Sequence, residues 1–312
     1  MRIVFAGSPA VAVPTLDALL ASPHQIVGVL TRPDAPKGRK HVVTPTPVAA
    51  RAEEAGIPVI RASRPGEETT EAIAELRPDL GVIVAYGAVL REPLLSTPRL
   101  GWINLHFSLL PRWRGAAPVP HAILAGDAVT GVSVFQLVPE LDAGLVYARL
   151  EEPIGRFDTN ATLLRRLAEL GAPLVVDTVD ALDRGTAVGV PQHGEARPAG
   201  KLELDDGIIQ WDRPAIEIDR LVRALTPAPD APAPSATTRL DGERFKILEA
   251  AVAHEAPPLA PGVVVAVGKR VLVGTRDGAL ELLRVQPFSK PAMTAEAWFL
   301  AGRRGERTAF DA

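Results

Sequence analysis

The stretch RIVFAGSPAVAVPTLDALLASPHQIVGVLT, residues 2–31, decides the fold class. It opens with a short apolar run, continues through a helix-like pattern over 14–22, and ends in a second apolar run over 25–31. Continuous apolar strands separated by amphipathic helices are typical of a parallel sheet covered on both faces. The alternation continues through PVAARAEEAG (47–56), PVIRA (58–62), EAIAELRP (71–78) and LGVIVAYG (80–87). The pattern therefore predicts a doubly wound, Rossmann-like α/β domain.

Further elements follow this repeat. We expect strands over WINLHF (102–107), GVSVFQLV (131–138) and LVYARLEEPI (145–154), then a helix pattern over 160–185 that is interrupted around Gly171 and Pro173. In doubly wound sheets, ligands bind beyond the carboxyl ends of the strands. A site is therefore expected in the loops after VIVAYG and WINLHF.

The character of the chain changes after residue 185. Gly and Pro without a period predict a linker over 186–204, between a first domain over 1–185 and a second over 205–312. The second domain has one helix pattern over 215–226 and a Pro-rich break over 227–236.

Short strands then dominate, and the Asp-Gly pairs in LDGE and RDGA each favour a tight hairpin. These features predict a small antiparallel, OB-like β-barrel, which is a common scaffold for nucleic-acid contact.

Composition excludes several classes of protein. The chain has 312 residues, 47% of them hydrophobic and 23% charged, which is long enough for two cores and ordinary for a globular protein. No apolar run approaches a membrane span, and the first residues lack a secretory pattern, so we expect a cytoplasmic protein without membrane contact.

Metal and thiol chemistry are also disfavoured. The absence of cysteine excludes disulfides and thiolate nucleophiles, and none of the six histidines forms a metal-binding pair, so no metal is expected. The net charge of −3 requires any nucleic-acid contact to come from local basic patches.

The sequence INLHFSLLPRWRGAAP (103–118) holds the strongest candidate for chemistry. Asn104 and His106 lie two apart, which on a strand puts both side chains on one face. An amide beside an imidazole can polarise a carbonyl and move a proton. The alternative is a polar pair that neighbouring loops satisfy.

Two other stretches belong with this pair. Ser108, Leu109, Leu110 and Pro111 would form a rigid loop that offers backbone groups and an apolar wall to a flat ligand. Asp142, in PELDAGLVY, is either an ordinary turn aspartate or a carboxylate that orients His106.

Basic side chains gather in two places. The loop TRPDAPKGRKHVV (31–43) is long for its position, and Arg39 and Lys40 in it are candidates for phosphate contact, unless the loop is merely solvated. Arg112, Trp113 and Arg114 follow the candidate site, where guanidinium and indole groups can hold an anionic or stacked partner. The first turn, FAGSPAVAVP, lacks the later glycines of a dinucleotide-binding loop, which disfavours a dehydrogenase.

Taken in order, FAGSP, RPDAPKGRK, VIVAYG, INLHFSLLPRWRGAAP, LDAG and KLELDDGIIQW resemble the methionyl-tRNA formyltransferase family over nearly the whole chain. The Asn-x-His-x-Ser-Leu-Leu-Pro block with a later Asp is shared by the wider group of enzymes that use 10-formyltetrahydrofolate. The basic loop and PRWRGAAP point to the member that acts on tRNA.

The resemblance implies a formyl transfer from 10-formyltetrahydrofolate to the α-amino group of initiator methionyl-tRNA, without a metal and by a monomer. Asn104, His106 and Asp142 would be catalytic. The segment Ser108–Leu109–Leu110–Pro111 would line the folate site, and the loop around Arg39 and Lys40 would meet the acceptor end of the tRNA.

This sequence departs from the family at two positions. Phe107 stands where relatives often have Gly, and the larger side chain is expected to narrow the folate pocket, while Leu145 stands where some have Asp. Rival interpretations are a formyltransferase for a sugar-nucleotide amine or a purine precursor, a formyl-folate hydrolase, and an RNA-binding protein without catalysis.

Overall fold

The computed structural model describes residues 1–37, 41–226, 234–302 and 307–311. The chain divides into two compact units. The first holds Met1–Pro118, Ala128–Ile154 and Leu163–Gly200, and the second holds Val119–Asp127, Gly155–Thr162 and Lys201–Ala312. No helix in the described ranges combines the length and apolar character needed to cross a membrane.

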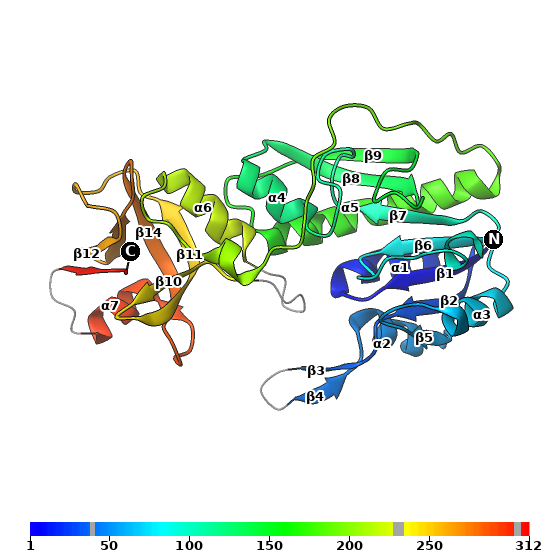
Figure 1. Cartoon of the computed structure of the whole chain (residues 1–312), viewed down its shortest axis with the longest axis horizontal. Helices are drawn as coiled ribbons and strands as arrows, with labels where there is room; N and C mark the ends of the chain where they lie inside the picture. The colour runs from blue at the N-terminus through cyan, green and yellow to red at the C-terminus, as the bar shows by residue number, and fades with distance from the viewer. Residues whose placement is uncertain (38–40, 227–233, 303–306, 312) are drawn as a thin grey trace. The chain divides into compact units, whose positions relative to one another are not determined.

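The first unit is built on one twisted sheet with the strand order β5-β2-β1-β6-β7-β8-β9 (Figure 1). The strands from β5 to β7 pair in parallel, as the sequence predicts, whereas β8 and β9 are antiparallel additions at one edge. The strands are β1 (Arg2–Gly7), β2 (Gln25–Thr31), β5 (Val59–Arg61), β6 (Leu80–Val84), β7 (Trp102–His106), β8 (Val129–Gln136) and β9 (Val146–Pro153).

Helices and short turns connect these strands. They are η1 (Ala10–Ala12), α1 (Val13–Leu20), α2 (Pro47–Glu54), α3 (Glu67–Glu75), η2 (Leu94–Ser96), α4 (Pro118–Ala125) and α5 (Asn160–Asp183). A separate hairpin of β3 (Ala35–Lys37) and β4 (Val42–Thr44) projects away from the seven-stranded sheet (Figure 1).

Both faces of the sheet are buried, which explains the continuous apolar strands. One face carries Val4, Ala6, Ile83 and Trp102, packed in one core cluster with Ile73 of α3. Glycine at position 81 is required on this face, because a Cβ there would lie 2.1 Å from the Trp102 ring. The doubly wound interpretation of the sequence is thus confirmed.

Helix α5 covers the opposite face. At Gly171 a Cβ would lie only 2.8 Å from the methyl carbons of Leu105 on β7, so the helix backbone packs directly on that strand. The prediction of an interruption around Gly171 and Pro173 is wrong, because α5 runs unbroken through both residues. Packing of its apolar face against the sheet outweighs the local cost of Pro and Gly.

The second unit is an antiparallel sheet in the order β10-β11-β14-β13-β12-β16, with β15 paired to β14. After β16, the Asp311 N–H donates to the Arg239 carbonyl of β10 at 2.9 Å, so the first and last strands of the order are linked and the sheet approaches a closed barrel. Its elements are η3 (Leu204–Gly207), α6 (Ala215–Ala224), β10 (Thr237–Leu240), β11 (Glu243–Val252), β12 (Val263–Val267), β13 (Arg270–Gly274), β14 (Ala279–Gln286), β15 (Met293–Thr294), α7 (Ala295–Ala301) and β16 (Arg307–Ala309).

The two Asp-Gly hairpins differ. Asp241 and Gly242 both have positive φ and form the tight turn between β10 and β11 that the sequence predicts. Between β13 and β14 the Thr275 N–H donates to the Gly278 carbonyl at 2.9 Å, so this hairpin is also closed by a short turn, but neither Asp277 nor Gly278 has positive φ. The Asp277 carboxylate accepts a hydrogen bond from the Ala215 N–H at 2.8 Å, at the start of α6.

Aromatic rings form the centre of the barrel core. Phe310 stacks on Trp211 at 5.2 Å and on Trp298 at 6.1 Å, and the Trp211 indole N–H donates to Thr238 Oγ1 at 3.1 Å.

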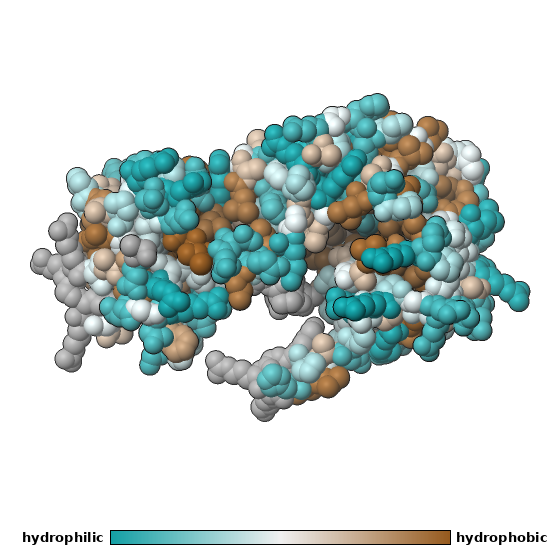
Figure 2. Space-filling view, viewed as in Figure 1, coloured by the Kyte–Doolittle hydropathy of each residue, from teal (hydrophilic) through white to brown (hydrophobic). Residues whose placement is uncertain are grey.

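The visible face of the molecule is mostly hydrophilic, with smaller groups of hydrophobic residues between (Figure 2).

Candidate active site

Strand β7 holds Asn104 and His106 on one face of the sheet, as their spacing predicts. Asn104 lies opposite Ile83 of β6 and Phe135 of β8, and His106 lies opposite Ser133 of β8. This face is also the one on which Trp102 is buried. The pair is therefore a polar interruption of an apolar face, near the carboxyl end of the strand.

The imidazole of His106 is buried and fixed in orientation. Its side chain is 7% exposed, and Nε2 lies 2.8 Å from the carbonyl oxygen of Trp113. Because a carbonyl oxygen only accepts, Nε2 carries the hydrogen, and Nδ1 of the neutral ring is left with its lone pair. The ring of Phe135 packs edge-to-face with the imidazole, with 6.2 Å between the ring centres.

Asp142 reaches the same place from the loop between β8 and β9. Since β8 runs antiparallel to β7, its last residues lie beside the start of β7, and the loop must fold back for Asp142 Oδ2 to lie 3.9 Å from His106 Nδ1. Asp142 has a φ of 48°, and its Oδ2 accepts from the Gly115 N–H at 2.7 Å. The carboxylate thus faces the open nitrogen of the ring, beyond hydrogen-bond distance.

Burial and charge act in opposite directions on His106. Removal from water lowers the pKa of the imidazole below its ordinary value, while the Asp142 charge and the hydrogen bond to the Trp113 carbonyl raise it. The lowering dominates, so the ring is a neutral base with a carboxylate poised to stabilise its protonated form. It is the Trp113 carbonyl, and not Asp142, that fixes the tautomer.

Asn104 is half-buried beside this base. Among the described residues its side-chain amide has no hydrogen-bond partner. The amide is not among the buried side-chain groups that lack a partner, so it is accessible from solvent. The amide is free to donate to a ligand.

The predicted ligand-lining segment after β7 is packed internally. Ser108 is fully buried, its hydroxyl donates to the Arg112 carbonyl at 2.6 Å, and Ser133 Oγ donates to the Ser108 carbonyl at 2.7 Å. Leu110 is 1% exposed and its N–H donates to Ser133 Oγ, and Pro111 is buried as well. Of the four side chains, only that of Leu109 is half-buried.

The structure shows where the two residues that depart from the family pattern lie. Phe107 is 6% exposed, so its ring is part of the packed interior. Leu145 is 44% exposed at the start of β9 and lies against Gly189.

The predicted basic contacts divide into two groups. Arg39 and Lys40 lie outside the described residues. In the second basic segment, the Arg112 guanidinium lies 5.8 Å from the centre of the Trp113 ring, whereas Arg114 donates to Gln192 Oε1 at 2.7 and 3.1 Å.

Sequence reasoning missed the contacts that hold this site together, although it singled out Trp113 for its indole ring. The Trp113 carbonyl, the Gly115 N–H and Ser133 act through groups that no residue pattern signals. Gln192 belongs to the stretch predicted as a linker, where nothing but its polar character distinguishes it. In the described parts of the chain, no group of three or more potential metal ligands is present.

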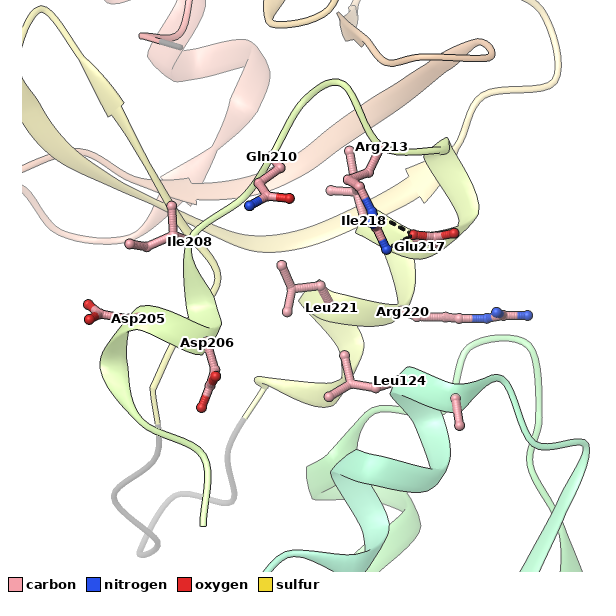
Figure 3. A pocket seen from close by; sticks show the side chains of 11 residues that line it. Leu124, Asp205, Asp206, Ile208, Gln210, Arg213, Glu217, Ile218, Arg220 and Leu221 are labelled. Carbon is pink, nitrogen blue, oxygen red and sulfur yellow. Dashed lines mark hydrogen bonds and ion pairs between the residues drawn. The ribbon is translucent and has the colours of Figure 1, made fainter. Parts of the chain in front are cut away.

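A cavity of about 660 Å³ lies in the second unit, apart from these residues (Figure 3). Leu124, Ile218 and Leu221 form apolar parts of its lining, and Asp205 and Asp206 lie on one side of it. None of the site residues predicted from the sequence lines it.

Comparison with known proteins gives a consistent result over the whole chain. The sequence profile of the formyl transferase family matches residues 1–179 of this chain, and the profile of the formyl transferase C-terminal domain matches residues 201–303. A methionyl-tRNA formyltransferase of Leifsonia xyli is 55% identical over 98% of this chain and 99% of its own length.

Solved structures share the fold at lower identity. Methionyl-tRNA formyltransferase from Clostridium thermocellum covers 82% of this chain and 95% of its own, with a TM-score of 0.60 and 15% identity. HypX from Aquifex aeolicus in complex with tetrahydrofolic acid covers 100% of this chain and 50% of its own, with a TM-score of 0.65 and 20% identity. With matches to both of its domains and a relative 55% identical over nearly its full length, this chain belongs to the formyl transferase family.

Proposed function

We propose that this chain transfers the formyl group of 10-formyltetrahydrofolate to the α-amino group of methionyl-initiator tRNA. The observation that carries the proposal is the buried neutral imidazole whose Nδ1 faces Asp142, beside an amide that has no partner among the described residues. The high identity to a methionyl-tRNA formyltransferase over nearly the full chain supports tRNA as the acceptor.

His106 acts as the base. Its Nε2–H is held by the Trp113 carbonyl, so Nδ1 is the atom that takes a proton from the attacking amine. The N–C bond to the formyl carbon forms, the bond from that carbon to N10 of the folate breaks, and N10 receives a proton. His106 Nδ1 is the group that can return it.

Asp142 stabilises the imidazolium that this transfer creates. Its Oδ2 lies 3.9 Å from Nδ1, close enough for a strong interaction between charges and far enough that the neutral ring keeps its lone pair available. The Gly115 N–H holds the carboxylate in this position.

Asn104 donates to the formyl oxygen as negative charge develops there. The amide lies on the same face as His106. Loss of one donor of this kind typically costs about 10²–10³ in rate.

The folate site extends along the segment after β7. The half-buried side chain of Leu109 suits contact with a flat ring. Ser108, Leu110 and Pro111 shape the loop through their internal packing and hydrogen bonds.

We infer that tRNA binding is shared between the domains. Arg39 and Lys40 contact the backbone near the acceptor end, and the barrel over 205–312 contacts a further part of the tRNA. We expect the chain to act as a monomer, and we expect the reaction to take place in the cytoplasm, where methionyl-tRNA is used.

The test is transfer of labelled formyl to initiator and elongator methionyl-tRNA side by side, with the wild type and His106→Ala. Formylation of the initiator alone, lost in the variant, supports both the reaction and the base. If neither tRNA is formylated while a sugar-nucleotide amine is, the acceptor in the proposal is wrong.

The role of the basic loop has its own test. Replacing both Arg39 and Lys40 with Ala should weaken tRNA binding and flatten its dependence on salt, since fewer counterions are then released. An unchanged affinity and salt slope would remove these residues from the interface.

A further inference from the structure

The segment over 190–199 is bound to both loops that form the candidate site. Val190 exchanges two hydrogen bonds of 2.9 Å with Val146 at the start of β9. Further along, the Ala199 N–H donates to the Arg114 carbonyl at 2.7 Å, and the Arg114 N–H donates to the Arg197 carbonyl at 2.9 Å. This part of the predicted linker is therefore an integral part of the first unit.

Gln192 lies in the middle of this segment and uses both ends of its amide. The amide nitrogen donates to the carbonyl oxygens of Asp142 at 2.8 Å and Gly144 at 3.0 Å. The amide oxygen accepts two hydrogen bonds from Arg114, at 2.7 and 3.1 Å. One half-buried side chain thus ties the loop of Asp142 to the segment that follows β7.

The loop of Asp142 needs such support. Asp142 has positive φ, a conformation that is uncommon outside glycine, although Asp tolerates it better than most residues. The carboxylate must also stay folded back over the sheet to face His106. Gly115 holds the side chain of Asp142 by one oxygen, and Gln192 holds its main chain, so the two contacts fix the carboxylate from different directions.

We propose that Gln192 is a positioning residue for catalysis, which keeps the Asp142 carboxylate beside Nδ1 of His106. This inference rests on the proposed function of the trio. Gln192 acts on the trio indirectly. Its amide donates to the carbonyl oxygens of Asp142 and Gly144 and accepts from the Arg114 guanidinium.

The chemistry of Gln192 allows its two contacts to be separated. Gln192→Glu keeps an acceptor for Arg114 but loses both donors and brings a negative charge to the two carbonyl oxygens. Gln192→Met keeps the length of the side chain without any polar atom. The adjacent and exposed His193→Ala serves as the matched control.

We expect both Gln192 variants to lower kcat for formyl transfer by about 10–100-fold, because displacement of a catalytic group by about 1 Å costs up to about 10²-fold. The KM for tRNA should stay unchanged. In Gln192→Met, which adds no charge, the acid limb of the pH–rate profile should move to lower pH, since His106 loses a charge that raises its pKa. His193→Ala should match the wild type in all three measurements.

The outcomes separate this inference from the proposed function. A wild type that formylates no methionyl-tRNA contradicts the proposed function itself. An active wild type with Gln192 variants of equal kcat and the same acid limb contradicts the role of Gln192. Lower activity that follows lower thermal stability, with the acid limb unmoved, also contradicts it, because the residue is then structural only.

Discussion

Replacing Asp142 with Asn removes the charge that faces His106 and leaves the geometry of the loop in place. The amide side chain of the Asp142→Asn variant keeps an oxygen to accept the Gly115 N–H, and the same main-chain carbonyl still accepts from Gln192. The side chains of His106 and Asp142 are 7% and 11% exposed, and their nitrogen and oxygen lie 3.9 Å apart.

The size of the effect follows from that distance. Two unit charges about 4 Å apart interact by about 4 kcal/mol at an effective dielectric constant of about 20. Since about 1.4 kcal/mol corresponds to a factor of ten in rate, loss of the full interaction with an imidazolium in the transition state lowers kcat by about 10³-fold.

The variant also has a signature in pH. His106 is a base only when neutral, so activity falls as the pH drops through its pKa. Burial already lowers that pKa and the Asp142 charge raises it. Removing the charge therefore lowers the pKa further, and the acid limb of the profile moves to lower pH.

The assay is single-turnover formylation of initiator methionyl-tRNA over a range of pH, with tRNA affinity and thermal unfolding as controls. Loss of less than about tenfold in rate, with an acid limb that stays in place, would refute a direct interaction between Asp142 and a protonated His106. A limb that moves to higher pH would refute the assignment of His106 as the base.

Other predictions concern single residues of the first unit. Asn104→Ala should lower kcat by about 10²–10³-fold with little change in folate or tRNA binding, and a loss confined to KM would argue against a transition-state role. Gly81→Ala should lower the free energy of unfolding in urea by about 1–3 kcal/mol, because its Cβ would lie 2.1 Å from Trp102, whereas Gly200→Ala, at an exposed position outside helices and strands where a Cβ meets nothing within 4 Å, should change it by less than about 0.5 kcal/mol. The folded-state pKa of His106 lies below the ordinary 6.5, so the unfolded chain binds this proton more readily. Its contribution to stability is present above pH 6.5 and is lost as the pH falls through the folded-state pKa, so unfolding at about pH 7.5 and about pH 5.5 should show a smaller loss in His106→Gln than in the wild type.

The fold follows closely from local patterns. The apolar runs at 2–7, 25–31 and 80–87 are typical of strands buried on both faces, and the helices between them favour parallel pairing. Sequence reasoning failed at Gly171 and Pro173, where the local preference to break a helix is real. Contact of Gly171 with Leu105, far away in sequence, keeps the helix intact.

The candidate site, too, could be predicted from the sequence only in part. The period of a strand is a local property, and it already puts Asn104 and His106 on one face. Asp142 can be singled out as a turn aspartate two residues before a glycine. Its approach to His106 depends on an antiparallel strand and a loop that folds back, and neither is encoded by its neighbours in sequence.

The sequence by itself therefore determined the two kinds of sheet and the pair on β7, because periodicity and turn chemistry act over a few residues. Only the tertiary structure decided what those residues meet: the Trp113 carbonyl that selects the imidazole tautomer, the Gly115 N–H that holds Asp142, and the Gln192 amide that fixes its loop. The physical reason is that every residue except proline offers the same main-chain N–H and C=O groups, so the group that a side chain meets is defined only once segments distant in sequence have packed together.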